Sequence, residues 1–397
     1  MGVNVFPAAS GGASYSSQPP ASASSVLLDG QLVTASSIST SVTGTGAPWL
    51  LYANGAGTTT ITIAGTPYTV TAGSTVGTSA YTGSQSVTVT GPSTAPSTFT
   101  ASTMPSSTTW QSVAYGLVSA TPTYVAVGNT TSSGAYSTNG STWTSSTMPS
   151  SQIWYAITYG NGYFVAVQGA NTTNAGAYST NGTTWTASTM PSTVQWHGVG
   201  YGNGYFVAVA QNTTSAAYST NGTSWTSSTM PSSISWQSVT YGNGYYVAVA
   251  SLSYTAAYST NGTTWTASSM PNAVGLKSVT YGNGYFVTVG GTTSTGAYST
   301  DGINWTASTM PSSASWTSVT YGNGYYVAVA YGTTAGSYST NGTSWTASTM
   351  PSASNWNGVT YGNNNFVAVA ATTIGAYFAQ SPLPVAYGIH NGATVRA

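Results

Sequence analysis

Charged side chains are nearly absent from this chain of 397 residues, in which only Asp29, Lys277, Asp301 and Arg396 carry a formal charge. An average globular protein has about a quarter of its residues charged. Binding to duplex nucleic acid requires a row of Lys and Arg that neutralises phosphates, and recruitment to an anionic membrane requires a basic cluster. The sequence therefore predicts no nucleic-acid partner and no electrostatic attachment to a membrane.

Cysteine is missing altogether, which excludes disulfides, thiolate metal sites and thiol catalysis. No stretch approaches the roughly 18 consecutive apolar residues of a transmembrane helix. Residues 1–10 lack the basic segment and the apolar run of a secretory signal peptide. We expect no membrane insertion and synthesis without such a signal.

Carboxylates and histidines are too few for the common catalytic and metal sites. Hard cations prefer several carboxylates, and zinc prefers His and Cys clusters. Glycoside hydrolysis uses paired carboxylates, but Asp29 and Asp301 fall in different predicted domains, and neither His197 nor His390 has an acidic neighbour in sequence. The sequence predicts no catalytic residue, no metal and no cofactor, and hence a protein that is not an enzyme.

Aromatic residues, in contrast, are abundant, with 13 Trp, 30 Tyr and 7 Phe in a chain that is 40% hydrophobic. Disordered chains lack the apolar and aromatic residues needed to bury a core. We therefore expect a folded protein. Because almost nothing but two histidines titrates between acid and about pH 9, its folding stability is expected to depend little on pH.

An internal repeat dominates the sequence. The dipeptide Met-Pro recurs seven times, at Met104, Met148, Met190, Met230, Met270, Met310 and Met350. In residues 231–270, four runs rich in Val, Tyr, Trp and Thr lie at 236–241, 245–250, 256–259 and 264–268, and the turns after the first and third runs contain Asn-Gly. Such runs favour strands joined as hairpins. Four strands in a period of about 40 residues are typical of a propeller blade.

The strand count predicts how a ring of blades would close. The first three runs occur seven times, but the fourth follows the third only six times and is missing after Tyr377. A matching segment, Phe99-Thr100-Ala101-Ser102, precedes Met104. We therefore predict an all-β chain in which residues 97–380 form a seven-bladed β-propeller of four-stranded antiparallel blades. Its last blade would take its outer strand from the N-terminal side, which leaves no open edge.

One turn carries a family resemblance. The segment Tyr298-Ser299-Thr300-Asp301-Gly302-Ile303-Asn304-Trp305 resembles the Asp-box (BNR-like) repeat of sialidase-type propellers. It departs from that pattern because Asp and Gly adjoin, and the other complete copies have Asn in place of Asp. Sialidase activity depends on an arginine cluster, whereas this chain has only Arg396, so a sialidase-like hydrolase is the least favoured of three functions.

With the phrase Tyr-Gly-Asn-Gly-Tyr-Phe-Val-Ala-Val, the repeat is similar to propellers of bacteriophage tail fibres and other virion-surface proteins. This resemblance implies a non-enzymatic fibre or spike protein on the virion surface or, alternatively, an extracellular or cell-surface protein. Residues 1–96 are predicted to form a small β-rich module and linker that contacts other virion subunits. Residues 381–397 are predicted to be a C-terminal tail, and a homo-oligomer is expected.

The repeats differ most at one end of the predicted blades. The turns after the first and third runs are nearly constant, whereas the loops between the second and third runs vary and are expected to account for the unequal periods. The second residue of the first run also varies, and we call these seven the crown residues: Gln111, Tyr155, His197, Gln237, Lys277, Thr317 and Asn357. They are predicted to surround the channel mouth and bind a neutral host-surface glycan or receptor. The alternatives are loops that simply drift and a structural virion subunit whose loops contact its neighbours.

Overall fold

The structure of the protein is a computed structural model that describes residues 25–28, 31–34, 37–54, 58–71, 75–90, 95–129, 131–251, 253–271, 275–291, 294–380 and 386–391. Every regular element in these ranges is a β-strand. No helix there is long and apolar enough to cross a membrane. The chain divides into a repeat domain, residues 95–380, and a small domain formed by residues 1–94 and 381–397.

The small domain contains one seven-stranded sheet in the order β2-β1-β32-β3-β6-β4-β5. Its strands are β1 (Ser25–Leu28), β2 (Gln31–Thr34), β3 (Ser37–Asn54), β4 (Thr58–Ile63), β5 (Thr66–Thr71), β6 (Thr75–Thr90) and β32 (Ala386–Asn391). Strand β32 pairs parallel to β1 and antiparallel to β3. The described residues of the predicted C-terminal tail, Ala386–Asn391, thus form a strand of this sheet. The expected turn at Asp29-Gly30 lies outside the described residues.

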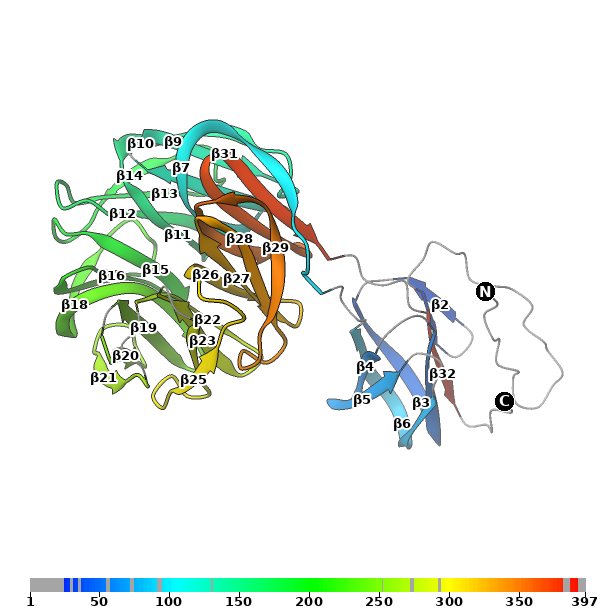
Figure 1. The fold of residues 1–397 in the computed structure, drawn as a ribbon. Helices are drawn as coiled ribbons and strands as arrows, with labels where there is room; N and C mark the ends of the chain where they lie inside the picture. Colours follow the sequence, from blue (N-terminus) through cyan, green and yellow to red (C-terminus); the bar gives the residue numbers. More distant parts are fainter. Residues whose placement is uncertain are drawn as a thin grey trace. The chain divides into compact units, whose positions relative to one another are not determined.

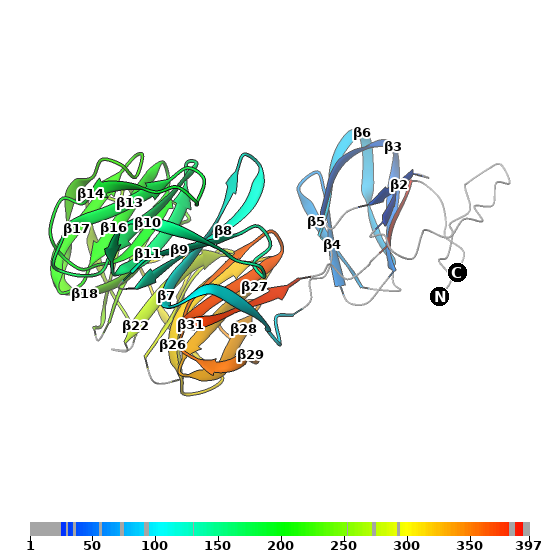
Figure 2. The same cartoon turned by 90° about the horizontal axis from the view of Figure 1, so that it is seen from above.

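The repeat domain is a propeller-like arrangement of antiparallel sheets (Figures 1 and 2). Three of its five sheets have four strands each: β11 (Trp154–Gly160) to β14 (Thr186–Thr189) through β12 (Tyr163–Gln168) and β13 (Ala175–Ser179); β22 (Leu276–Gly282) to β25 (Thr306–Thr309) through β23 (Tyr285–Gly290) and β24 (Thr295–Ser299); and β26 (Ser315–Gly322) to β29 (Thr346–Ser354) through β27 (Tyr325–Tyr331) and β28 (Thr333–Ser339). These three sheets are repeats 2, 5 and 6.

The remaining repeats share two larger sheets, so the expected seven separate four-stranded sheets are not observed. The seven-stranded sheet contains β15 (Trp196–Gly202), β16 (Tyr205–Ala210), β17 (Thr213–Ser219), β18 (Thr226–Gly242), β19 (Tyr245–Ser251), β20 (Thr255–Ser259) and β21 (Thr266–Ser269). The six-stranded sheet contains β7 (Thr100–Val118), β8 (Thr121–Asn129), β9 (Thr131–Ser137), β10 (Thr144–Gln152), β30 (Trp356–Gly362) and β31 (Asn365–Ala379). The sheets merge because β18 and β7 remain extended through Met-Pro. The first half of each strand pairs with one repeat and the second half begins the next repeat.

The strand expected from the N-terminal side is confirmed. Strand β7 pairs antiparallel with β31, with Thr100 opposite Tyr377 and Ala101 opposite Ala376. The other half of β7 pairs with β8, with Trp110 opposite Gly128. The segment before Met104 therefore completes the sheet of repeat 7 and continues into repeat 1.

The second strand of each repeat forms the core. In β16, for example, Val207, Ala208 and Val209 are all fully buried, as expected for a strand covered on both faces. One face packs on the following repeat, so that Val207 and Val209 share a cluster with Trp236 and Tyr246. Equivalent clusters recur between consecutive repeats, and one of them joins Val367 and Val369 of repeat 7 to repeat 1.

The turn after the first strand explains why its sequence is constant. In each repeat the glycine after the conserved tyrosine lies against a tyrosine ring of the next repeat, as Gly202 does against Tyr241 and Gly362 against Tyr115. A Cβ on Gly242 would lie 2.0 Å from Cγ of Tyr281. The next residue of the turn, such as Asn243, has a positive φ, which Asn tolerates.

Repeat 1 departs from this constant turn. Its first hairpin continues to Val118 opposite Thr121, so the extra length of this repeat lies there and not in its loop between the second and third strands. Leu117 at the hairpin end is 52% exposed. The expectation that the variable loops explain the unequal periods is therefore wrong for repeat 1.

Candidate functional site

The structure brings all seven crown residues to one pocket. This pocket has a volume of about 550 Å³ and is lined by the first strands of all seven repeats. Three successive positions of each strand contribute to its wall: a crown residue, a small Ser, Ala or Gly, and a Val or Ile. Below the polar crown, the wall therefore has one layer of small side chains and then one layer of apolar side chains. A volume in this range suits a small molecule.

A β-bulge places each crown residue. In all seven repeats the pairing of the first and second strands shifts register across the crown position, as between Trp196 and Gly198 on either side of His197. The crown residue is the extra residue without a ladder partner. Bulges redirect a side chain and are common next to active sites. Each repeat thus contributes one residue at the pocket that takes no part in the pairing of the sheet.

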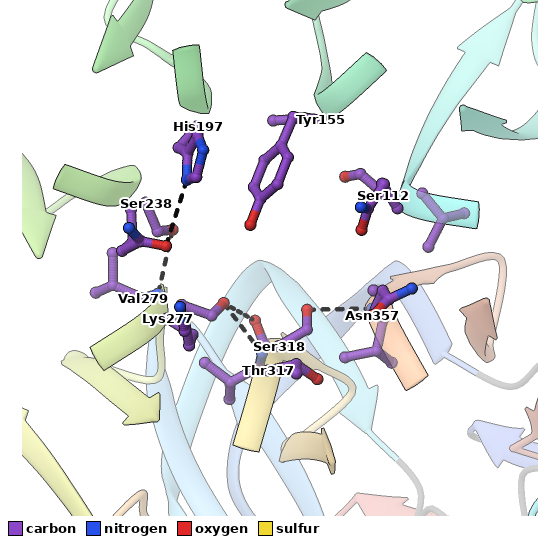
Figure 3. Close-up of a pocket in the computed structure, with 18 of the residues that line it drawn as sticks. Ser112, Tyr155, His197, Ser238, Lys277, Val279, Thr317, Ser318 and Asn357 are labelled. Carbon is purple, nitrogen blue, oxygen red and sulfur yellow. Dashed lines mark hydrogen bonds between the residues drawn. The ribbon is translucent and has the colours of Figure 1, made fainter. Parts of the chain in front are cut away.

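His197 is held on both sides by neighbouring repeats (Figure 3). Its ring stacks on that of Tyr155, with centroids 3.9 Å apart and planes at 17°. On the other side, its Nδ1 lies 3.4 Å from Oε1 of Gln237. Gln237 is 4% exposed and donates from Nε2 to Oγ of Ser235 at 2.8 Å. Since the amide nitrogen is used in this way, its oxygen accepts from Nδ1–H and leaves Nε2 of the neutral imidazole as an acceptor.

The electrostatic surroundings keep His197 uncharged. Desolvation lowers its pKa, the hydrogen bond to Gln237 raises it, and the nearby positive charge of Lys277 lowers it, with a net pKa of about 4. The imidazole is therefore neutral at pH 7. Desolvation also raises the pKa of the Tyr155 hydroxyl, so that this group stays protonated.

The position of Tyr155 depends on a glycine in the following strand connection. A Cβ on Gly169 would lie 2.8 Å from Cβ of Tyr155. The backbone N–H of Gly169 donates to the carbonyl of Ile153 at 2.8 Å. The buried amide of Gln168 organises the same loop through Ala170 and Thr173. The variable loop of repeat 2 thus has a packing role, because it supports one wall of the pocket.

Lys277 is the one charged residue that lines the pocket. Desolvation lowers the pKa of its ammonium group. Asp301, the other charged residue in the described ranges, lies in the turn after β24, where its carboxylate accepts hydrogen bonds from Ser299, Ile303 and Asn304.

The remaining crown residues contribute to the wall in different ways. Thr317 donates to the carbonyl of Trp356 at 2.6 Å, and Asn357 donates to the carbonyl of Trp110 at 2.9 Å. Both therefore connect first strands of adjacent repeats, while Gln111 lines the pocket beside them. Serines one position further on make similar links, since Ser278 accepts from the N–H of Val319 at 3.1 Å. Sequence reasoning missed these serines, although their recurrence at a fixed distance from the crown position was a usable signal.

No group of three or more His, Cys, Asp and Glu side chains suited to a metal ion occurs among the residues that the structure describes. The pocket lining contains one His and no carboxylate. Its chemistry therefore rests on amides, hydroxyls, one neutral imidazole and one ammonium group.

Comparison with solved structures shows what this arrangement resembles. A streptogramin B lyase matches with a TM-score of 0.64 at 12% identity, over 71% of this chain and 97% of that one. A virginiamycin B lyase from Staphylococcus aureus, a catalytically inactive histidine-to-alanine variant with quinupristin, matches with a TM-score of 0.63 at 13% identity, over 70% and 98% of the two chains. The fold is that of a β-propeller. No family model and no curated protein matches the sequence.

These neighbours correct two predictions. The expected function was a non-enzymatic virion fibre or spike protein, but the solved structures that share the fold include lyases, which are enzymes. The prediction that the chain is not an enzyme is overturned by the same finding. The comparisons show no relation to Asp-box proteins or to phage proteins. At 12–14% identity, the likeness to the lyases establishes the fold and leaves the reaction to be argued from the pocket.

Proposed function

We propose that the chain is a propeller enzyme that acts on a small molecule held in the pocket between the first strands, with His197 as the proton acceptor. The observation that carries this proposal is the hydrogen-bonded chain from Ser235 through Gln237 to Nδ1 of His197. A candidate base needs a fixed orientation and an unprotonated nitrogen facing the substrate. The Tyr155 stack and the Gln237 hydrogen bond supply the first, and the lowered pKa supplies the second.

The proposal includes a finer statement of the architecture, in which the seven repeats are seven blades of one closed ring. Three contacts between repeat 7 and repeat 1 support it: the pairing of β31 with β7, the packing of Gly362 on Tyr115, and the hydrogen bond from Asn357 to Trp110. Contacts of the same three kinds join consecutive repeats elsewhere: β17 pairs with β18, Gly202 packs on Tyr241, and Thr317 donates to Trp356. Closure matters for the site because the pocket wall needs a first strand from every repeat.

The reaction class that fits this pocket is elimination, the chemistry that the name lyase denotes. Nε2 of His197 removes a proton from a substrate carbon, and the electron pair of the broken C–H bond forms a double bond to the adjacent carbon. The bond from that carbon to the leaving group breaks, and the leaving group departs with its electron pair as an anion. The hydroxyl and amide donors of the pocket lining, such as those of Ser238 and Gln111, can hydrogen-bond to the departing anion.

The test is a turnover assay on the full chain. Purified protein is incubated with a panel of small esters, ethers and lactones that includes quinupristin, and products are detected by mass spectrometry. We expect at least one compound to be converted with loss of a leaving group and no addition of water. The variant His197→Gln should reduce that rate by about 100-fold or more, the usual contribution of general acid–base catalysis. The variant His390→Gln, which changes the other histidine of the chain, should leave it unchanged.

Two results would overturn the proposal. One is the absence of any turnover across the panel under conditions in which the protein is folded. The other is a turnover that His197→Gln and His390→Gln affect equally, because proton abstraction by His197 requires a difference between them.

A further inference from the structure

We infer that the molecule recognised by this pocket carries an anionic group, such as a carboxylate, that binds Lys277, and an apolar part that enters the Val and Ile layer below. The inference rests on the proposed function, because it names the substrate class of the same site. It also replaces the expectation of a neutral glycan or receptor. Three features of the described residues carry it: the charge of the lining, the arrangement of its layers, and the position of Lys277 relative to His197.

The charge of the pocket is unbalanced. Lys277 lines it, while no Asp or Glu does. The carboxylate of Asp301 is engaged by its own turn through the backbone N–H groups of Ile303 and Asn304, at 2.9 and 2.8 Å. Lys277 is exposed in this lining and has no carboxylate beside it there, so its charge is open to a ligand. A ligand anion would pair with that charge, whereas a neutral ligand would cover it without giving it a counter-ion.

The layers of the wall indicate the rest of the ligand. Beneath the crown lie Ser112, Ser238, Ser278 and Ser318, and then the side chains of Val113, Ile157, Val199, Val239, Val279, Val319 and Val359. The third-layer residues are buried. A ligand with a charged end and an apolar end can satisfy both levels at once, because Lys277 is at the rim and the apolar layer is below it. Tyr331, half exposed and also in the lining, adds an aromatic surface at the mouth.

The position of Lys277 couples such a ligand to the proposed base. The groups that face His197 are Tyr155 from β11, Gln237 from β18 and Lys277 from β22, and the positive charge of Lys277 lowers the pKa of His197. An anion at Lys277 offsets that charge and adds its own negative potential. The pKa of His197 should therefore rise on binding, which makes the imidazole a stronger base only when an anionic substrate is present.

A matched set of probes tests the inference on the full chain. The carboxylate is 4-phenylbutyrate, its neutral match is 4-phenylbutanamide and its cationic match is 4-phenylbutylamine. Affinity is measured by titration calorimetry and by chemical shifts of ¹³C-labelled histidine. We expect the carboxylate to bind about tenfold more tightly than the amide, as a charge-assisted contact predicts, and the amine to bind most weakly. Carboxylate binding should also raise the pKa of His197, while amide binding should not.

Lys277→Gln should abolish the preference for the carboxylate and the rise in the pKa of His197. Arg396→Gln removes the other basic residue of the chain and should leave both unchanged. The inference is overturned if neither probe binds, if the amide binds as tightly as the carboxylate, or if Lys277→Gln keeps the preference. It fails independently of the proposed function when turnover depends on His197 but no anion preference is found. It survives failure of that function when the carboxylate binds through Lys277 without any turnover.

Discussion

The two ends of the first strands follow opposite rules. At the turn end, the Tyr-Gly pair is the same in every repeat, because the glycine of one repeat lies against the tyrosine of the next. At the pocket end, the crown residue is different in nearly every repeat, because a bulge removes it from the sheet pairing. Both ends contact neighbouring repeats. Only the turn end does so by one identical contact that any change would break.

This difference separates packing from chemistry within a single strand. In β15, Tyr201 and Gly202 belong to the repeated contact, while the crown residue His197 stacks on one crown neighbour, Tyr155, and hydrogen-bonds to the other, Gln237. A repeat protein thus keeps one end of each strand for closing the assembly. The other end is open to individual side chains, and there the site occurs.

The largest effect is expected from a substitution at the turn end. Gly242→Ala would place a Cβ 2.0 Å from Cγ of Tyr281, and relief of that overlap requires the two repeats to separate. We expect a loss of about 4 kcal/mol of unfolding free energy, at the upper end for single substitutions. Gly244→Ala, at a φ of +82° with nothing within 4 Å, should cost only about 1–2 kcal/mol of backbone strain. Urea unfolding of both variants measures the difference, and equal losses would show that the close contact is not what keeps the turn constant.

At the pocket end, the expected effect depends on pH. The pKa of His197 is lowered from 6.5 to about 4 by desolvation first, with the charge of Lys277 adding to it. The unfolded chain therefore binds a proton more readily than the folded one, so stability is full above pH 6.5 and falls as the pH drops toward 4. The loss approaches about 3 kcal/mol. This prediction replaces the expectation that stability barely depends on pH.

Unfolding measured at pH 3.5 and pH 7.5 tests that slope. His197→Gln should remove most of it, whereas His390→Gln should retain it. If His197→Gln unfolds with the same acid dependence as the unchanged chain, His197 is not held neutral by the pocket, and the electrostatic account of the site is wrong.

The sequence was informative where residues act through periodicity. The four-strand repeat, the strand supplied by the segment just before Met104 and the gathering of the crown residues all follow from counting and alternation, and the structure shows each of them. The sequence did not predict that β18 joins two repeats in one sheet, because Met-Pro is equally compatible with a turn between two separate strands. The bulges could not be predicted, because the sequence of one strand does not show which of its residues lacks a partner on the neighbouring strand.

The site was less accessible to sequence reasoning than the fold. His197 was set aside as a catalytic residue because no carboxylate is near it in sequence, but its orienting partner is the amide of Gln237, 40 residues away in the next repeat. The ligand was expected to be neutral because the chain is nearly uncharged, although Lys277 was among the predicted crown residues and lies in the lining. A low total charge says little about a site in which a single ammonium group decides the field.

The smallest expected effect returns to the turn end and tests how interchangeable its residues are. Desolvation raises the pKa of Asp301, but hydrogen bonds from Asn304, Ile303 and Ser299 outweigh it and bring the pKa to about 2. Stability from this group is present above pH 3.8 and is lost as the pH falls toward 2. Because the carboxylate lies in a surface turn where solvent screens it, the loss should be well under 1 kcal/mol.

Asp301→Asn should remove this acid dependence and otherwise preserve stability, because Asn341 and Asn261 accept the same backbone hydrogen bonds in their own turns. The reciprocal variant Asn261→Asp should introduce the dependence in repeat 4. Unfolding free energies between pH 2 and pH 5 measure both. A loss at neutral pH in Asp301→Asn that exceeds the acid effect would mean that the charge has a partner beyond its turn, and that the turn end is less uniform than its repeated contacts indicate.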